Sequence, residues 1–253
     1  MAIARPGRAR VVALETNALL VRAIPYGEAD LVAQFFTERH GRLSAMVRGG
    51  RRSKKRASGG FEPFHTLHLR LDDRGAELCT LRDAEISQVR GGLVASLPAM
   101  DAGGRALRWA RMLFPPRVAE PEAWSTLVGL LDALDAAEAG DAGAPATLLA
   151  WAGLRLLASA GFGLELEACI VCGKVCPESR RALVDVARGG VVCTGCGGGA
   201  LSLPWPVRRL AQGLARAETA ADLAPHVAPT AARALLELVA RAMEHHALQG
   251  ARA

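Results

Sequence analysis

Two pairs of cysteines share the spacing Cys-x-x-Cys in the second half of the chain. Cys169 and Cys172 form the first pair, Cys193 and Cys196 form the second, and 20 residues separate the pairs. Two intervening residues let both sulfurs of a pair reach one ion from a tight turn, and the double spacing is typical of four-cysteine zinc sites. Because four thiolates fill a tetrahedral site and leave no position for water, the pattern predicts one structural Zn²⁺ and no catalytic metal.

The residues around the cysteines favour the same arrangement. A glycine, Gly173 or Gly197, directly follows each pair, and it eases a tight turn whose backbone N–H groups can hydrogen-bond the thiolates. Residues 183–192 have the pattern of a β-hairpin, which would return the second pair to the first. The sequence therefore predicts a zinc module over residues 168–199.

Other interpretations of the cysteines remain open at this stage. The four could be reduced thiols without a metal, and Cys176 could replace Cys172 as a ligand, although we interpret Cys176 as a spare thiol. A redox Cys-x-x-Cys would need a βαβ context, which is missing here. A zinc deaminase is excluded because no histidine is followed two residues later by glutamate. Cys79 lies in a strand pattern and is predicted to be a core residue.

A run of basic residues in the first third of the chain is the second candidate site. Between residues 39 and 61 there are eight basic residues and no acidic one. They are Arg39, Arg42, Arg48, Arg51, Arg52, Lys54, Lys55 and Arg56. Each cation that meets a phosphate releases a condensed counterion, so the run predicts a binding site for DNA; the alternative is a solvated loop. Tyr26, Phe61 and Phe64 could stack on bases, but each is expected to be a core residue.

The overall charge agrees with a polyanionic partner. The net charge is +6, and residues 1–85 hold 15 Lys and Arg against 10 Asp and Glu. The excess therefore lies in the N-terminal third, where nucleic acid is expected to bind. The sequence contains no phosphate-binding loop of the G-x-x-x-x-G-K-[ST] type, no G-x-S-x-G and no HExxH. We therefore predict that the protein is not an enzyme.

Strand patterns fill the first 85 residues. Short runs that alternate apolar and polar residues, separated by turn formers, predict five strands. They cover residues 18–24, 31–36, 42–47, 67–71 and 76–81. This number of short strands suits a small, partly open barrel, and the OB-fold is the common nucleic-acid-binding barrel of that size. Residues 1–85 are thus predicted to be an OB-fold domain.

Helical periodicity replaces the strand patterns after residue 97. Apolar residues at helical spacing, with prolines at the helix starts, predict five helices. They cover residues 98–113, 121–139, 145–160, 206–217 and 230–248. The third is apolar almost all round and is predicted to be central. The expected fold class is α+β multidomain, in which an OB-fold β-barrel precedes an α-helical domain over 86–253 that carries the four-cysteine module.

The termini and the longest apolar stretch bear on the cellular location. The first ten residues have no apolar run behind their arginines, so they do not resemble a signal peptide. Residues 147–164 are too short and too interrupted for a membrane span. A cytoplasmic, nucleoid-associated protein with no membrane partner is expected.

Several segments, taken in order, resemble the RecO family of DNA repair proteins. In the N-terminal third these are residues 18–30 (ALLVRAIPYGEAD), 36–45 (FTERHGRLSA), 49–55 (GGRRSKK), 61–64 (FEPF) and 80–85 (TLRDAE). Further on, the two cysteine pairs with Gly189 and Gly190 resemble the zinc-bearing members, and residues 241–246 (RAMEHH) resemble their closing helix. The resemblance covers nearly the whole chain. Two departures are the extra Cys176 and the ending of residues 249–253, which lacks a basic-Leu-Lys-Ser pattern.

The resemblance implies a recombination mediator. Such proteins bind single-stranded DNA, act with RecR and with the C-terminal tail of the single-stranded DNA-binding protein SSB, help RecA to load and anneal complementary strands. They do so without hydrolysing nucleotide. The competing hypothesis is a zinc-ribbon adaptor or transcription-associated protein, whose basic loop would bind duplex DNA or RNA. A preference for single strands distinguishes the two.

Overall fold

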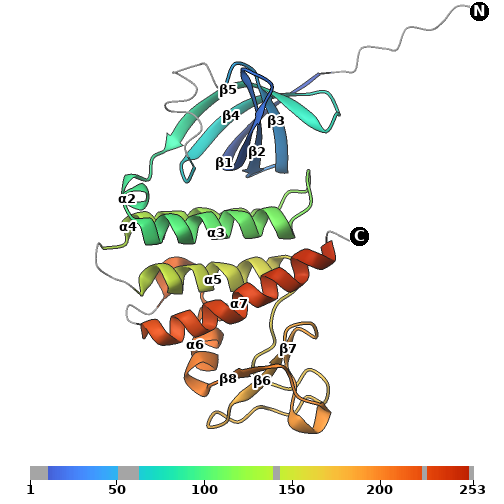
Figure 1. The fold of residues 1–253 in the computed structure, drawn as a ribbon, viewed down its shortest axis with the longest axis vertical. Helices are drawn as coiled ribbons and strands as arrows, with labels where there is room; N and C mark the ends of the chain where they lie inside the picture. The colour runs from blue at the N-terminus through green and yellow to red at the C-terminus, as the bar shows by residue number, and fades with distance from the viewer. Residues whose placement is uncertain (1–10, 51–62, 139–142, 224–226, 251–253) are drawn as a thin grey trace, which may run out of the picture. The chain divides into compact units, whose positions relative to one another are not determined.

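The computed structural model describes residues 11–50, 63–138, 143–223 and 227–250, and the chain divides into two compact units. The first unit comprises residues 1–89 together with 116–119, and the second comprises residues 90–115 and 120–253. The first unit is a β-barrel, and the second consists of helices with a small β-sheet (Figure 1).

The five strands of the first unit form a closed barrel. They are β1 (Val12–Tyr26), β2 (Asp30–Thr37), β3 (Gly41–Val47), β4 (Thr66–Asp73) and β5 (Leu78–Gln88). Their order is β1-β2-β3-β5-β4, with β3 parallel to β5 and the other pairs antiparallel. This is the strand order of an OB-fold, so the predicted barrel is confirmed; it is closed, because β1 pairs with β4.

Side-chain alternation decides which residues of the barrel face the core. Along β3, Leu43, Ala45 and Val47 are buried, whereas Arg42 and the other alternate residues are half-buried on the outer face. Inward-facing leucines from β4 and Phe35 from β2 complete the interior. One face of β3 therefore packs in the barrel core, and the other face belongs to the outer surface of the barrel.

Strand β1 is longer than its sequence pattern predicts. The predicted strand covers residues 18–24, whereas β1 covers Val12–Tyr26. Its first half pairs with β4, from Val12 opposite Asp73 to Leu19 opposite Thr66, and its second half pairs with β2. The first half is mostly exposed or half-buried, so it shows little apolar periodicity, and pairing with β4 alone extends the strand.

A segment distant in sequence completes the barrel beside the start of β3. Pro116 forms a parallel β-bridge with Arg42, and the Arg117 N–H donates to the Arg42 carbonyl oxygen at 3.0 Å. Gly41 has φ +63°, and a Cβ there would lie 1.8 Å from the Val118 carbonyl oxygen. Only glycine fits both the positive φ and this close approach.

The Arg117 side chain holds the turn between β4 and β5. Its guanidinium nitrogens donate to both carboxylate oxygens of Asp73, at 2.7 and 3.2 Å, and to the Ala76 carbonyl oxygen. Asp73 also accepts from the Gly75 N–H at 2.9 Å. The Arg117 guanidinium, as the main cause, keeps the pKa of the Asp73 carboxyl below its ordinary value of 3.8. This turn is one of the loops that OB-folds use to bind oligonucleotides.

We expect Arg117→Gln to loosen this turn without unfolding the barrel. The pair is partly exposed, so the loss in unfolding free energy at neutral pH is at most about 1 kcal/mol, and amide exchange at Gly75 becomes faster. Because the folded-state pKa of Asp73 is lowered, the pair stabilises the fold above about pH 3.8 and ceases to do so as the pH falls through the lowered pKa. The difference between wild type and variant should therefore shrink at low pH.

Hydrogen exchange with mass or NMR detection at neutral and acidic pH measures this effect. Arg39→Gln, an exposed position in the turn between β2 and β3, is the control and should leave Gly75 exchange unchanged. Equal exchange at Gly75 in Arg117→Gln and wild type would show that Arg117 does not hold the turn.

The second unit contains the predicted helices. They are α3 (Leu97–Leu113), α4 (Pro121–Ala136), α5 (Ala144–Ser159), α6 (Trp205–Arg216) and α7 (Pro229–Gly250), with the short α2 (Gly91–Val94) before them. Proline stands in the first turn of α3, α4, α5 and α6, where its missing N–H costs nothing. The predicted helix over 121–139 ends earlier, at Ala136, and residue 139 lies outside the described ranges.

Helix α5 is central, as its all-round apolar pattern predicts. It packs against α3, α4, α6 and α7, and Figure 1 shows it between α3 and α7. Trp151 on α5 is 1% exposed, and its indole N–H donates to the Ala217 carbonyl oxygen at 3.1 Å. Within the described ranges, no helix combines the length and the apolar character that a bilayer span requires.

The segment between α5 and α6 forms a separate small sheet. Its strands are β6 (Ala182–Asp185), β7 (Gly190–Val191) and β8 (Leu201–Leu203), in the order β7-β6-β8. Strands β6 and β7 form the predicted hairpin, with Arg188 and Gly189 in the turn and Gly190 opposite Asp185. The 3-10 helix η1 (Thr194–Cys196) follows β7.

Candidate metal centre and nucleic-acid interface

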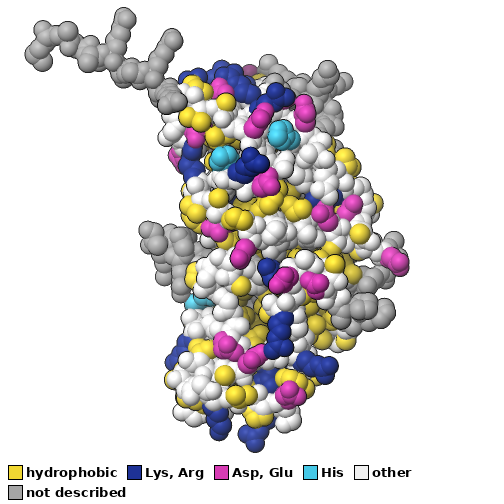
Figure 2. Space-filling model, turned by 180° about the vertical axis from the view of Figure 1, so that it is seen from behind, with side chains coloured by type: hydrophobic (Ala, Val, Ile, Leu, Met, Phe, Trp, Pro, Cys, Tyr) yellow, Lys and Arg dark blue, Asp and Glu magenta, His cyan; other side chains and the backbone are white. Residues whose placement is uncertain are grey.

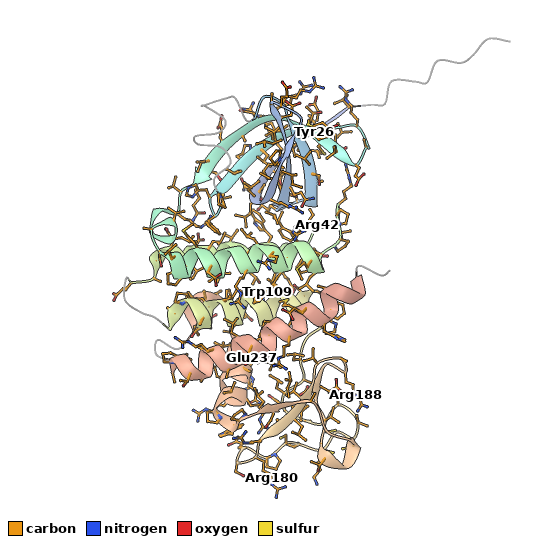
Figure 3. All side chains as sticks on the ribbon, viewed as in Figure 1. Tyr26, Arg42, Trp109, Arg180, Arg188 and Glu237 are labelled. Carbon is orange, nitrogen blue, oxygen red and sulfur yellow. The ribbon has the colours of Figure 1, made fainter. Side chains whose placement is uncertain are left out.

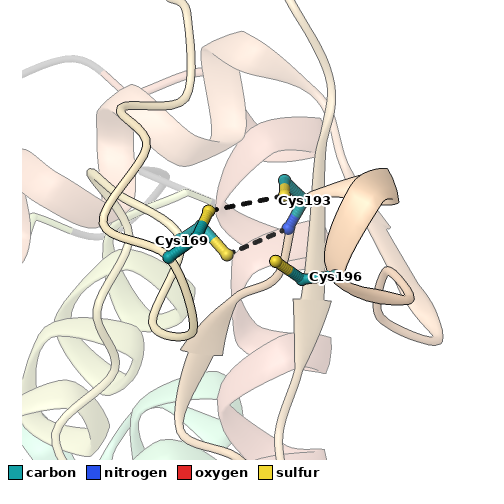
Figure 4. Close-up of side chains that lie close together, drawn as sticks. Cys169, Cys193 and Cys196 are labelled. Carbon is teal, nitrogen blue, oxygen red and sulfur yellow. Dashed lines mark hydrogen bonds between the residues drawn. The ribbon is translucent and has the colours of Figure 1, made fainter.

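Four cysteine sulfurs converge on one point beside the small sheet. The Sγ atoms of Cys169, Cys172, Cys193 and Cys196 all lie within 4.8 Å of one another. The Cys172 and Cys193 sulfurs are 3.8 Å apart, and a tetrahedron with Zn–S bonds of about 2.3 Å has edges of about 3.8 Å. In Figure 4 the sulfurs of Cys169, Cys193 and Cys196 point toward one another. These four residues could hold one metal ion.

Two tight turns position the sulfurs. In the first, the Cys169 N–H donates to the Lys174 carbonyl oxygen at 2.9 Å, and the Gly173 N–H donates to the Cys169 carbonyl oxygen at 2.8 Å. In the second, the Cys196 N–H donates to the Cys193 carbonyl oxygen at 2.9 Å. Gly173 has φ +72°, a left-handed conformation that glycine adopts without strain. The two turns have the same design, a Cys-x-x-Cys loop closed by backbone hydrogen bonds.

A backbone hydrogen bond attaches the first turn to the hairpin. The Ile170 N–H donates to the Val191 carbonyl oxygen at 2.9 Å, directly before Val192 and Cys193. Gly190 lies so close to the chain that a Cβ there would be 2.4 Å from the Glu165 carbonyl oxygen. The β6–β7 hairpin therefore carries the second pair to the first, as its sequence pattern predicts.

The thiols of the cluster have different proton affinities. Backbone N–H groups, first that of Cys193 and then that of Cys172, lower the pKa of the Cys169 thiol to about 6. The Cys193 N–H lies 3.3 Å from the Cys169 sulfur. Hydrogen bonds with the Cys193 and Cys172 side chains raise the pKa of Cys196 to about 12. The backbone thus stabilises one thiolate, and a further negative charge in the cluster needs a cation.

The donor set fits a structural metal. Four converging sulfurs, supported by a backbone N–H donor, fit the ligands and the outer-shell hydrogen bonding of a four-cysteine zinc site. When bound, the ion would link the two turns. With all four thiolates as ligands, no position would remain for water or substrate.

The other two cysteines lie outside the cluster. The Cys176 thiol is half-buried, and Cys176 is absent from the group of four whose sulfurs converge. The carbonyl oxygens of Cys176 and Pro177 accept hydrogen bonds from the buried Arg208 side chain, at 3.1 and 2.7 Å. Cys79 is buried in the barrel core, as predicted, and burial raises the pKa of its thiol.

The structure describes three of the eight basic residues predicted to bind DNA. Arg39 is exposed in the turn before β3, Arg42 lies on the outer face of β3, and Arg48 is exposed just after β3. Arg39 and Arg48 are therefore at opposite ends of one strand (the position of Arg42 is labelled in Figure 3). Five members of the set lie outside the described residues: Arg51, Arg52, Lys54, Lys55 and Arg56.

The part of the basic run that follows β3, at Arg48 and Gly49, lies beside the turn between β1 and β2. The Asp30 carboxylate accepts a hydrogen bond from the Gly49 N–H at 2.7 Å, and Asp30 pairs with Tyr26 across that turn. Tyr26 is 58% exposed (Figure 3), so the expectation that it is a core residue is wrong. Phe64 is buried, as expected, and Phe61 lies outside the described residues. An exposed aromatic ring and the exposed Arg48 thus flank one end of the outer face of β2 and β3.

Sequence reasoning missed cations that the fold places on relevant surfaces. Arg117 reaches the barrel from the α3–α4 connection, 44 residues from Asp73 in sequence. Lys174, Arg180 and Arg181 lie in one short segment, residues 174–181, and they line one groove of the cysteine module. Counting charge along the chain hides Arg117, because only the fold brings it to Asp73.

The fold and the site together define a class of protein. A closed five-stranded barrel of OB order, followed by a helical unit with an inserted four-cysteine cluster, is an organisation suited to binding nucleic acid. The family model "Recombination protein O N terminal" matches residues 12–90, and "Recombination protein O C terminal" matches residues 99–252. The chain belongs to the RecO family of DNA repair proteins.

Curated relatives support the assignment. The chain is 31% identical to the DNA repair protein RecO of Anaeromyxobacter sp. (strain Fw109-5) over 237 residues, which is 92% of this chain and 91% of the relative. It is 34% identical to that of Anaeromyxobacter dehalogenans (strain 2CP-1 / ATCC BAA-258), covering 90% and 89%. It is 33% identical to that of Myxococcus xanthus (strain DK1622), covering 72% of each chain.

Proposed function

We propose that this protein is a recombination mediator that binds single-stranded DNA through its barrel. One observation carries the proposal: the acid-free basic run passes the β1–β2 turn at Arg48 and Gly49, near exposed Tyr26, on the face that OB-folds use for oligonucleotides. Cations there would contact phosphates, and an aromatic ring offers a stacking face for an unpaired base. The structural metal is proposed to be one Zn²⁺ held by the four-cysteine cluster.

The proposed partners follow from membership of the family. The protein would act at the nucleoid with RecR and SSB to load RecA, and it would anneal complementary strands. None of these steps requires hydrolysis of nucleotide by this chain, in agreement with the absence from its sequence of the nucleotide-binding motif sought above.

A titration of labelled DNA tests the main proposal. Fluorescent single-stranded and duplex oligonucleotides of equal length are titrated with the full chain, with and without SSB. A mediator favours the single strand and still binds when the strand carries SSB. Equal or stronger binding to duplex, with no effect of SSB, would instead support the zinc-ribbon adaptor.

We propose a groove between α6 and α7 as the site for the SSB tail, which is acidic and ends in apolar residues. The groove encloses about 690 Å³. Its walls include Trp205, Leu210, Leu214, Leu223 and Val227. It shares Trp205, Arg209 and Gly213 with a neighbouring cleft that Arg208 and Arg216 also line. The charged residues that line the groove are Arg209 and Asp222, and Glu167 and Glu178 also line the neighbouring cleft. Apolar walls with an exposed arginine match the chemistry of such a tail.

A second groove of the helical unit fits the tail less well. It is larger, at about 930 Å³, and lies among α4, α5 and the 3-10 helix η2 (Ala220–Asp222). The charged residues that line it are Asp132 and Glu138, and no arginine or lysine does. Like charge would repel an acidic peptide. The α6–α7 groove is therefore preferred.

Arg209→Ala should weaken binding of an SSB C-terminal peptide by roughly tenfold to a hundredfold, because a lost charge-assisted hydrogen bond costs roughly 1.5–3 kcal/mol. Calorimetry with the full, zinc-loaded chain measures the affinity, and excess single-stranded DNA should not displace the peptide. Arg108→Ala, an equally exposed arginine on α3 that does not line this groove, is the matched control. If the peptide does not bind to wild type, SSB is not a partner of this protein. If Arg209→Ala and Arg108→Ala lose the same affinity for the peptide, the α6–α7 groove is not its binding site.

A further inference from the structure

The four-cysteine module has a groove that the four cysteines of the cluster line together with other side chains. The groove encloses about 920 Å³ between the first cysteine turn, residues 179–183 and residues 191–196. Three cations line it, Lys174, Arg180 and Arg181, and none of its lining residues is Asp or Glu. All three are exposed. Figure 2 shows several Lys and Arg side chains, with Asp and Glu side chains among them, at the end of the second unit where Figure 1 draws β6, β7 and β8.

The charges of these three residues are available to a ligand. Among the ion pairs of the described residues, none includes Lys174, Arg180 or Arg181. The Arg181 guanidinium donates a hydrogen bond to the Ser202 hydroxyl at 3.5 Å. The neighbouring cations differ. Arg188, at the hairpin turn, pairs with Asp185 at 3.4 Å, and Arg216 pairs with Glu167. Figure 3 shows Arg180 and Arg188 at separate places on the module.

The acidic residue of this loop lies elsewhere. Glu178 lines the cleft beside α6, with Arg208 and Arg209, and it does not line the groove. The fold thus separates Glu178 from Arg180 although they are two residues apart. This separation creates a surface of one sign, which the sequence does not reveal.

Neutralising the metal centre is the simplest competing role for the three cations. Zn²⁺ with four thiolates carries a net charge of −2. Nearby cations could therefore have the single role of balancing this charge. The hydrogen bonds to sulfur described within the module come from backbone N–H groups and from other cysteines, and none comes from Lys174, Arg180 or Arg181. Three cations against a charge of −2 also leave an excess of +1.

We propose that this groove is a second binding surface for a nucleic-acid strand, in addition to the barrel. The proposal rests on the proposed function, because it assumes that the barrel binds the first strand. No aromatic residue lines the groove, so the strand is held by its phosphates and is not read by its bases. A chain with two strand-binding surfaces can hold complementary strands together, which is what annealing requires.

The triple variant Lys174→Gln, Arg180→Gln, Arg181→Gln tests the proposal in the full, zinc-loaded chain. With short oligonucleotides, wild type should bind two strands per chain and the variant one. The slope of log affinity against log salt for the second strand should fall by roughly 0.7 per lost contact, about 2 for three contacts. Annealing should slow, whereas binding of the first strand stays unchanged.

Two further variants sharpen the test. Arg188→Gln removes a cation that is already paired, so it should leave stoichiometry and slope unchanged. The single variant Arg180→Gln changes a residue that is not adjacent in sequence to any cysteine. It should lower the slope by about 0.7 even if the triple variant folds poorly.

Five outcomes decide the matter. Loss of the second strand in the triple variant, with zinc retained, supports the proposal. Loss of zinc from Arg180→Gln would show that the cation balances the thiolates, and loss of SSB-peptide binding with DNA binding intact would assign the groove to an acidic peptide; either result overturns it. Wild type that binds no single strand contradicts the proposed function itself, whereas wild type that binds only one contradicts this inference alone.

Discussion

Replacing Cys169 or Cys196 by alanine is expected to remove the metal and to unfold the module of residues 168–199. The apparent binding energy of Zn²⁺ at structural four-ligand sites is roughly 10–16 kcal/mol, far more than a small sheet contributes by itself. The three strands β6, β7 and β8 contain four, two and three residues, too few for independent stability. The cluster is thus expected to be the main source of order in this segment.

Metal analysis and amide exchange measure the effect. Both variants should purify with no zinc, and the hydrogen bond from the Ile170 N–H to the Val191 carbonyl oxygen should lose its protection. Cys176→Ala is the matched control, because its thiol is outside the cluster, and it should keep one zinc per chain. Full zinc occupancy in both Cys169→Ala and Cys196→Ala would contradict the assignment.

The loss should remain local. Arg208 fastens the module to α6 through the carbonyl oxygens of Cys176 and Pro177, and it is 1% exposed. When the module unfolds, this buried guanidinium loses its acceptors, which costs part of the stability of α6. Helix α5 also packs against α3, α4 and α7, so the remaining bundle should stay folded.

The periodicity of apolar residues in the sequence was sufficient to predict most helices and strands of the fold. The all-round apolar pattern of residues 145–160 predicts a central helix, and α5 is one. The alternation over residues 42–47 predicts the two faces of β3. Both patterns are local consequences of burial, so both are visible in a single chain.

Contacts between residues that are far apart in the chain could not be predicted from the sequence. The first half of β1 is a strand because β4 pairs with it, and Arg117 stabilises a turn 44 residues away. Tyr26 is exposed because it lies at a hairpin turn, although aromatic residues are usually buried. The cysteine cluster was predictable for the opposite reason, since metal geometry restricts the spacing of its ligands within a short segment.

Removing four charges from the basic run is expected to give the largest loss of DNA binding. In the variant Arg51→Gln, Arg52→Gln, Lys54→Gln, Lys55→Gln, the affinity for single strands should fall for all sequences alike, because phosphates carry no sequence information. The slope of log affinity against log salt should flatten by roughly 0.7 per lost contact, about 2.8 for four. Fluorescence titrations at several salt concentrations, with oligonucleotides of different sequence, measure both quantities.

A control on the same barrel separates a local site from the effect of net charge. Arg70 and Arg82 lie on β4 and β5 and already pair with Asp83 and Asp72. Since these guanidiniums have a carboxylate partner, they release few counterions on binding DNA, and Arg70→Gln with Arg82→Gln should change the slope little. If the quadruple variant keeps the wild-type slope, the run after β3 is not the phosphate site. The double variant could instead flatten the slope by as much per removed charge as the quadruple variant does. DNA binding would then depend on the net charge of the first unit, and not on a defined interface beside Asp30 and Gly49.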